Sequence, residues 1–164
     1  IEEYLLIHKK LKMINKNIKF SSDFIIGYPG EEDEDFEKTM DLINEIKFIN
    51  SYSFIYSPRP GTSAANLAVV DNDKTKKRLE IIQKKLFENQ LERNKSLENT
   101  VINVLVENRM KDGVKLFGRT EFMTSVIFDG SEENIGNIVQ VKITGSNQNS
   151  LFGILKENYN KRVA

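Results

Sequence analysis

The chain contains no cysteine and no tryptophan, and it has one histidine and three prolines among its 164 residues. Without cysteine it forms no disulfide and offers no thiolate nucleophile, zinc-binding thiolate or iron–sulfur ligand. It also lacks an apolar run long enough to span a membrane and the pattern of a signal peptide. Because the formal net charge is +0, any surface for nucleic acid must be a local patch. The first residue, Ile1, falls inside a helical pattern, which predicts that the chain begins within a longer protein.

One stretch combines a short apolar run with a glycine-rich turn and a helix start. Residues 24–26 (Phe-Ile-Ile) are apolar in succession, which predicts a strand covered on both faces. Residues 27–30 (Gly-Tyr-Pro-Gly) predict a tight turn, and the five carboxylates of residues 31–35 are typical of a helix N-terminus. Such a turn either holds a ligand or uses its glycines for the backbone alone, and a second motif must decide.

Helical periodicity predicts three amphipathic helices, in residues 1–15, in residues 36–46, and from Asp71 or Asp73 to residue 97. The expected buried positions are Tyr4, Ile7, Leu11 and Ile14; Phe36, Met40, Ile43 and Ile46; and Leu79, Ile82, Leu86, Phe87 and Leu91. His8 lies off the first stripe, so we expect it to be a solvated surface residue. The third helix is expected to join two domains, residues 1–97 and 98–164.

A second strand is predicted where Tyr52, Phe54 and Tyr56 alternate with smaller or aliphatic residues. The proline- and glycine-rich residues 57–61 end it in a stiff loop that exposes Arg59 and the hydroxyl of Thr62. Helix, strand, helix and strand in this order predict two βα units of a parallel sheet or barrel, with the site at the C-terminal strand ends. Arg59 either binds a carboxylate or phosphate there or bridges two loops structurally.

The last third changes to short strands, expected near residues 102–106, 114–120, 124–128, 135–144 and 151–155. A hairpin turn is expected at Asp112-Gly113. Five short strands in this length predict a small barrel of the oligonucleotide-binding type. The candidate RNA contacts are Lys115, Arg119, Thr120, Lys142, Asn149 and Ser150, which are otherwise turn and strand-edge residues.

These motifs resemble one enzyme family. Residues 22–31 (Ser-Asp-Phe-Ile-Ile-Gly-Tyr-Pro-Gly-Glu) are similar to a late barrel strand of the radical-SAM methylthiotransferases. Residues 53–62 (Ser-Phe-Ile-Tyr-Ser-Pro-Arg-Pro-Gly-Thr) resemble the signature of one branch, the tRNA-2-methylthio-N6-dimethylallyladenosine synthases. Residues 104–107, 118–120 and 149–153 are similar to the TRAM domain that ends these enzymes. The implied fold is α/β plus all-β: the last βα units of a radical-SAM partial TIM barrel, then a five-stranded OB-like TRAM barrel.

The resemblance implies a cytoplasmic, monomeric transferase that adds a methylthio group to an adenosine beside the tRNA anticodon. It implies S-adenosylmethionine and two 4Fe-4S clusters as cofactors, with all cluster cysteines outside this chain, so that the chain alone is expected to be inactive. The implied S-adenosylmethionine contacts are Asp23, Ile26, Gly27, Pro29, Gly30 and Glu31, and the implied substrate contacts are Tyr56, Arg59 and Thr62.

Four residues depart from the common family pattern, namely Glu32, Ser63, Met123 and Thr124. The last two replace an Asn and an Arg, which removes an expected phosphate contact of the TRAM domain. Three alternatives stay open: a paralogous enzyme that modifies a ribosomal-protein aspartate, a non-catalytic RNA-binding module that works through residues 99–164, and a structural scaffold without a ligand. We predict weak, salt-sensitive RNA binding because few cations are available.

Overall fold

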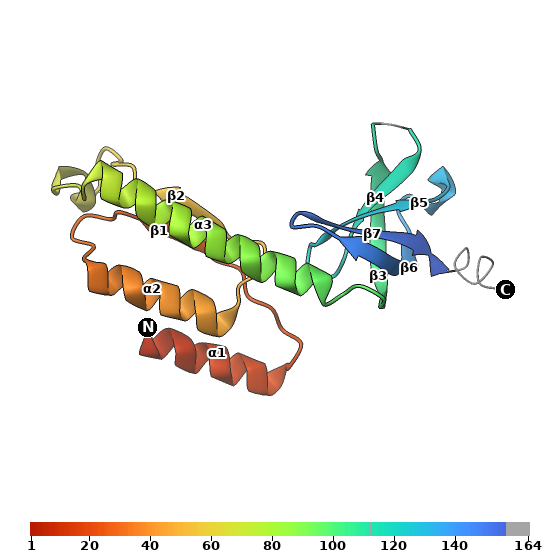
Figure 1. The fold of residues 1–164 in the computed structure, drawn as a ribbon, viewed down its shortest axis with the longest axis horizontal. Coiled ribbons are helices and arrows are strands. Elements are labelled where there is room, and N and C mark those ends of the chain that lie inside the picture. The colour runs from red at the N-terminus through yellow and green to blue at the C-terminus, as the bar shows by residue number, and fades with distance from the viewer. Residues whose placement is uncertain (112, 157–164) are drawn as a thin grey trace. The chain divides into compact units, whose positions relative to one another are not determined.

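The structure is a computed structural model that describes residues 1–111 and 113–156. The chain divides into two compact units, unit 1 (residues 1–89) and unit 2 (residues 90–164). Unit 1 contains α1 (Glu2–Ile14), β1 (Asp23–Ile26), α2 (Asp33–Ile46), β2 (Tyr52–Ile55), a short 3-10 helix η1 (Ser63–Asn66) and most of α3 (Asn72–Lys95) (Figure 1). The expected domain boundary after residue 97 therefore falls just beyond α3, whose last residues already belong to unit 2.

Unit 1 is built on a core between helices and one face of a two-stranded sheet. Ile43 and Ile46 of α2 pack with Ile82 and Leu86 of α3. Phe36 and Met40 pack against this cluster, so the predicted inner face of α2 is confirmed. The prediction for α3 is confirmed at Leu79, Ile82 and Leu86 but wrong at Phe87, which is 51% exposed.

The buried face of α1 differs from the predicted one. Tyr4, Ile7 and Ile14 are all exposed, and it is Leu5 that packs against the core. His8 lies on the same side as Leu5, its ring 4.7 Å from the ring of Phe20. Both ring nitrogens are buried without a hydrogen-bond partner among the described residues, so the expectation of a solvated histidine is wrong. Leu11 is half-buried, so the predicted stripe is wrong at three of its four positions. Apolar residues occur on both sides of α1, and their spacing alone could not identify the buried side.

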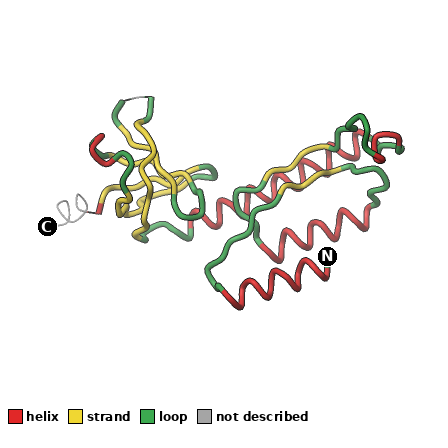
Figure 2. The backbone as a smooth tube through the Cα atoms, turned by 180° about the vertical axis from the view of Figure 1, so that it is seen from behind, coloured by secondary structure: helices red, strands yellow, loops and turns green. Residues whose placement is uncertain are grey.

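The sheet of unit 1 is covered on one face. β1 and β2 are parallel, with Ile25 opposite Phe54 and Asp23 opposite Tyr52. Phe24 and Ile26 point to the core, whereas Ile25 is 58% exposed, so the expectation of a strand covered on both faces is wrong for the described chain. Tyr52 and Phe54 share the exposed face, and Figure 2 shows both strands in front of α3.

Unit 2 is a closed five-stranded barrel with the strand order β3-β4-β5-β7-β6. Its strands are β3 (Val101–Arg109), β4 (Lys115–Arg119), β5 (Ser125–Asp129), β6 (Ile138–Ser146) and β7 (Ser150–Leu155), with a short 3-10 helix η2 (Glu132–Asn134) after β5. β5 and β7 are parallel and the other pairs are antiparallel. Alternate residues, such as Val104, Leu116 and Phe128, fill the interior. This confirms the five predicted strands.

The β3–β4 hairpin turns where the sequence predicts it, although Asp112 itself lies outside the described residues. The N–H of Gly113 donates to the carbonyl of Met110, and that of Met110 donates to the carbonyl of Lys115. In the part of the chain that the structure describes, no helix is long and apolar enough to cross a membrane.

Candidate functional sites

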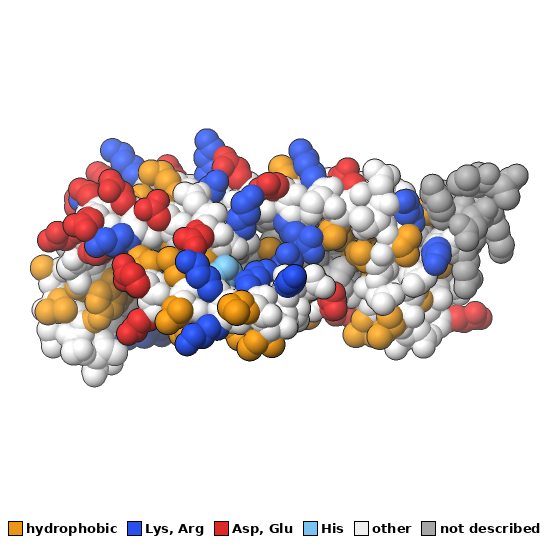
Figure 3. Space-filling view, turned by 90° about the horizontal axis from the view of Figure 1, so that it is seen from below, with side chains coloured by type: hydrophobic (Ala, Val, Ile, Leu, Met, Phe, Trp, Pro, Cys, Tyr) orange, Lys and Arg blue, Asp and Glu red, His pale blue; other side chains and the backbone are white. Residues whose placement is uncertain are grey.

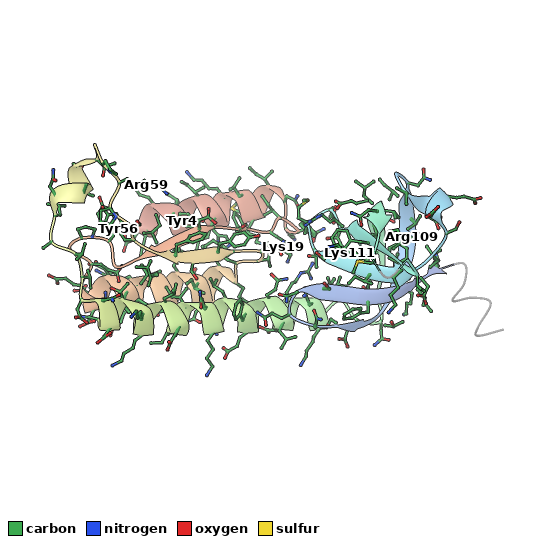
Figure 4. All side chains as sticks on the ribbon, turned by 90° about the horizontal axis from the view of Figure 1, so that it is seen from above. Tyr4, Lys19, Tyr56, Arg59, Arg109 and Lys111 are labelled. Carbon is green, nitrogen blue, oxygen red and sulfur yellow. The ribbon has the colours of Figure 1, made fainter. Side chains whose placement is uncertain are left out.

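Two loops leave unit 1 at the same edge of its sheet. The turn of residues 27–31 follows β1, and the loop that carries Tyr56 and Arg59 follows β2 (Figure 4). The N–H of Tyr56 donates to the carbonyl of Ile26 at 2.8 Å, and the rings of Tyr28 and Tyr56 meet edge to face at 5.2 Å. The loops after the two strands are therefore neighbours, as expected for parallel strands joined by a helix.

The turn after β1 is closed by the side chain of Glu31. Its Oε2 accepts the N–H of Gly27 at 2.7 Å, and its own N–H donates to the carbonyl of Tyr28. Gly27 and Gly30 both have a positive φ, which favours glycine. A Cβ on Gly27 would lie 2.6 Å from Cγ2 of Thr75, whereas a Cβ on Gly30 would meet nothing within 4 Å. The lack of a side chain at Gly27 thus lets the turn pack against Thr75 of α3, whereas the space beside Gly30 is open.

A buried arginine of α3 holds the same turn from the other side. Arg78 is 4% exposed, and its guanidinium contacts Oε1 of Glu31 at 2.5 Å and Oδ1 of Asp33 at 2.6 Å. Lys74 contacts the same Asp33 oxygen at 2.8 Å. Hydrogen bonds from Lys74 and then Arg78 lower the pKa of Asp33 below its ordinary value. Figure 3 shows acidic side chains gathered toward the end of unit 1 where α2 begins.

The residues expected to touch S-adenosylmethionine have different surroundings. Ile26 is 2% exposed with its side chain in the core, and Pro29 is buried as well. Asp23 lies on the exposed face but at the start of β1, away from the turn. Gly30 is exposed, and a Cβ at this position would meet nothing within 4 Å. The role of all six residues as contacts of S-adenosylmethionine stays a prediction.

The loop after β2 presents a cation. The carbonyl of Arg59 accepts both the N–H and the hydroxyl of Thr62, the latter at 2.8 Å, so the hydroxyl of Thr62 closes the loop. The guanidinium of Arg59 is exposed, with no ion pair or hydrogen bond to any described residue. It therefore does not bridge the two loops here. The hydroxyl of Tyr56 is buried without a hydrogen-bond partner among the described residues.

Unit 2 has a groove of its own, with a volume of about 650 Å³. It lies between the end of α3, the outer face of β3 and the turn that joins β4 to β5. Much of its lining is apolar and exposed: Met123 by 59%, Ile138 by 71% and Leu105 by 45%. Its charged residues are Arg93, Arg119 and Glu121. A mainly apolar groove with a few polar groups is the usual form of a small-ligand site.

The two arginines of the groove each lie over an aromatic ring. The guanidinium of Arg93 is 6.0 Å from the ring centre of Phe122, and that of Arg119 is 5.3 Å from the ring centre of Phe117. Partial burial lowers the pKa of Arg93 from its ordinary value. Arg119 also contacts Glu107 at 3.2 Å, which offsets its charge. The groove thus offers stacked, planar cations beside apolar side chains.

The predicted RNA contacts are only partly brought together. Arg119 and Thr120 line the groove, and the Thr120 hydroxyl accepts the N–H groups of Phe122 and Thr124 at 3.2 Å. Lys142 donates to the carbonyl of Asn99 and lies opposite the groove residue Val101 in the β3–β6 pairing. Lys115 stands at the other end of β4 from Arg119.

Asn149 and Ser150 belong to a tightly held loop. Their N–H groups both donate to Oδ1 of Asn147, at 2.9 and 2.7 Å. Asn94 at the end of α3 is fully buried, and its Nδ2 donates to the carbonyls of Asn147 and Gln148. Sequence reasoning missed Arg78, Arg93, Asn94 and Phe122. The sequence signal for Arg78 was that a charged residue lies at helical spacing from the buried positions of α3.

Comparison with known proteins gives two findings. Residues 95–156 match the TRAM domain family. Over its whole length the chain is 70% identical to a protein of Pelagibacter ubique named tRNA-2-methylthio-N(6)-dimethylallyladenosine synthase, of which it covers 37%. Proteins of the same name from Ruthia magnifica and Yersinia enterocolitica are 49% and 45% identical over 93% of the chain, which covers 35% and 33% of them. The chain thus spans about a third of the length of the relatives it matches.

Proposed function

We propose that this chain belongs to the family of the tRNA-2-methylthio-N(6)-dimethylallyladenosine synthases and is the C-terminal part of such an enzyme. The proposed reaction adds a 2-methylthio group to N6-dimethylallyladenosine beside the tRNA anticodon. The observation that carries this proposal is the 70% identity to a relative of that name across all 164 residues.

Unit 1 fits the last βα units of a radical-SAM barrel. Its two parallel strands have their core on one face, while Ile25, Tyr52 and Phe54 leave the other face more than half exposed. In a closed βα barrel that second face lines the interior. We take it to be part of the inner wall, with the remaining strands in the portion of the relatives that this chain does not span.

The edge of the sheet fits S-adenosylmethionine, a ligand with an adenosine and an amino-acid part. Gly30 leaves open space, and Tyr28 and Tyr56 form an aromatic pair beside it. When bound, S-adenosylmethionine and two 4Fe-4S clusters would supply the radical and sulfur chemistry, with cluster cysteines outside this chain. The guanidinium of Arg59 would bind a tRNA phosphate and so position the adenosine at the barrel mouth.

The groove of unit 2 is the proposed RNA contact, and its lining favours an unpaired nucleotide. Bases stack on aromatic rings and on arginine planes, and Phe122 and Arg93 offer both. Exposed Met123 and Ile138 extend the apolar surface available to the base. Arg93 and Arg119 would contact phosphates, so few counterions would be released on binding.

The alternatives differ in what they require of the chain. A paralogue that modifies a ribosomal-protein aspartate is disfavoured by the names of the relatives, which specify a tRNA adenosine. A non-catalytic RNA-binding module would need unit 2 alone and would leave Arg59 without a role. Activity of the intact protein separates these functions.

The enzyme proposal is tested with the intact protein and tRNA that carries N6-dimethylallyladenosine. We expect mass spectrometry of the digested tRNA to detect the 2-methylthio nucleoside. Arg59→Ala should lower kcat/KM by roughly tenfold or more, because a charge-assisted contact is lost. Lys84→Ala, which removes an exposed cation of α3, is the control and should have little effect. An intact protein that carries its clusters and binds tRNA without forming product would refute the proposal and favour the binding module.

The groove proposal is tested by fluorescence titration of the 164-residue chain with a single-stranded RNA. We expect Phe122→Ala to weaken binding by about tenfold, because stacking contributes about 1–3 kcal/mol per base. Arg93→Gln should weaken it as well and lower the salt slope by about one. Phe87→Ala removes an exposed ring of α3 in unit 1 and is the control. Equal affinity of all four proteins would show that RNA does not use this groove.

A further inference from the structure

Two side chains of α3, Arg78 and Thr75, lie against the turn of residues 27–31. We propose that Arg78 and Thr75 are positioning residues that fix the turn of residues 27–31 in a single conformation. We further propose that they thereby set the affinity for S-adenosylmethionine; this second step rests on the proposed function. Arg78 acts through Glu31, to which it donates, and Thr75 acts through Gly27, against which it packs.

The carboxylate of Glu31 transmits the effect of Arg78 to the backbone. Oε1 accepts from the guanidinium of Arg78 at 2.5 Å, while Oε2 accepts the N–H of Gly27 at 2.7 Å. Arg78 also reaches the backbone carbonyl of Glu31 at 3.4 Å. One carboxylate therefore connects the helix to the first residue of the turn. This arrangement makes Glu31 a structural link within the turn.

The burial of this pair makes it sensitive to the loss of either partner. Arg78 is 4% exposed and the side chain of Glu31 is 13% exposed. Removing one member of a buried ion pair leaves the other charge without compensation in a poorly hydrated place. The guanidinium of Arg78 also lies over the ring of Phe36, 5.2 Å from the ring centre. A lysine cannot reproduce both contacts of this planar group.

Thr75 acts on the same turn by shape. It is 3% exposed, and its hydroxyl donates to the carbonyl of Asp71 at 2.8 Å, which holds the side chain in one orientation. Its methyl group fills the space where any side chain on residue 27 would stand. Thr75 and Arg78 are one helical turn apart, so both face the same side of α3. Together they secure Gly27 by packing and by a hydrogen bond.

The exchange rate of the Gly27 amide measures this link directly, without any ligand. In the 164-residue chain we expect Arg78→Met to speed Gly27 amide exchange by tenfold or more, measured by NMR. Arg78→Lys should restore part of the protection. Lys74→Met is the control, because Lys74 contacts Asp33 and not Glu31. If Arg78→Met fails to fold, Glu31→Gln tests the same link, since it removes the charge that Arg78 faces. Unchanged exchange in a folded Arg78→Met or Glu31→Gln protein would overturn the positioning role.

The ligand part of the inference is tested in the intact enzyme with its clusters loaded. We expect Arg78→Met to raise KM for S-adenosylmethionine by fivefold or more, with a smaller change in kcat and an unchanged cluster content. Lys74→Met should leave KM unchanged. If Gly27 exchange quickens while KM stays the same, the turn is fixed by Arg78 but the proposed cofactor site lies elsewhere. If no variant or wild-type protein forms product, the proposed function fails and the exchange result still decides the role of Arg78.

Discussion

Gly118 lies on the inner side of β4, where β3 passes so closely that no side chain fits. A Cβ at this position would lie 2.6 Å from Cγ1 of Val104 and would also clash with the backbone carbonyl of Leu105. A backbone atom of a paired strand cannot move aside as a flexible side chain can. Gly118→Ala must therefore push β3 and β4 apart, where Val106 pairs with Gly118. We expect a loss of about 3 kcal/mol, the upper end of the usual cost of overpacking.

For a unit of this size, a loss of about 3 kcal/mol lowers Tm by roughly 12–24 °C. Two-dimensional NMR of the 164-residue chain during heating follows the barrel signals separately from those of unit 1. Gly145→Ala is the matched control, because Gly145 lies in β6 of the same barrel and a Cβ there meets nothing within 4 Å. It should change stability by less than about 0.5 kcal/mol. If the barrels of the Gly118→Ala and Gly145→Ala variants had the same Tm, the reasoning would be refuted.

Two further predictions concern polar contacts. Asn94→Ala removes the donors to the carbonyls of Asn147 and Gln148 and should destabilise the barrel by about 1–3 kcal/mol, measured by urea unfolding; an unchanged midpoint would contradict it. The pKa of Asp33 is lowered in the folded chain, so its contribution is present above the ordinary value of 3.8 and is lost as pH falls through the lower folded value. Lys74→Met should raise the pKa of Asp33 toward 3.8, which a carboxyl NMR titration would detect.

The barrel of unit 2 could be predicted closely because its strands are half-buried. Alternation of apolar residues along β3, from Ile102 to Val106, reports an inside and an outside directly. The structure also explains the glycines in the two segments that resemble the TRAM domain, residues 118–120 and 149–153. Gly153, like Gly118, stands where a Cβ would strike a neighbouring strand, 2.6 Å from the carbonyl of Lys142. The pattern could not indicate the groove, because that depends on how α3 ends beside β3.

The residues that were missed are mostly polar residues in buried positions. Four polar side chains of α3 are at most 5% exposed: Thr75, Arg78, Asn89 and Asn94. The first three lie at helical spacing from Ile82 and Leu86, which are buried in the same helix. A search for apolar periodicity passes over them, since their burial depends on partners far along the chain. Asn89 donates to the carbonyl of Ile43, and Arg78 pairs with Glu31. A polar residue at a core spacing of a helix is therefore a signal for a long-range contact.

The exposed face of β1 explains why a correct local pattern gave a wrong statement about burial. Three apolar residues in a row indicate a strand with neighbours on both faces, and Ile25 is nevertheless 58% exposed. Tyr52 and Phe54 are exposed on the same face, so the discrepancy extends over both strands. A protein rarely leaves such a face to water, since each large side chain gains roughly 1.5–3 kcal/mol from burial. The proposed function accounts for this face, because the remaining strands of the proposed barrel or a ligand bound inside it would cover Ile25 and Phe54.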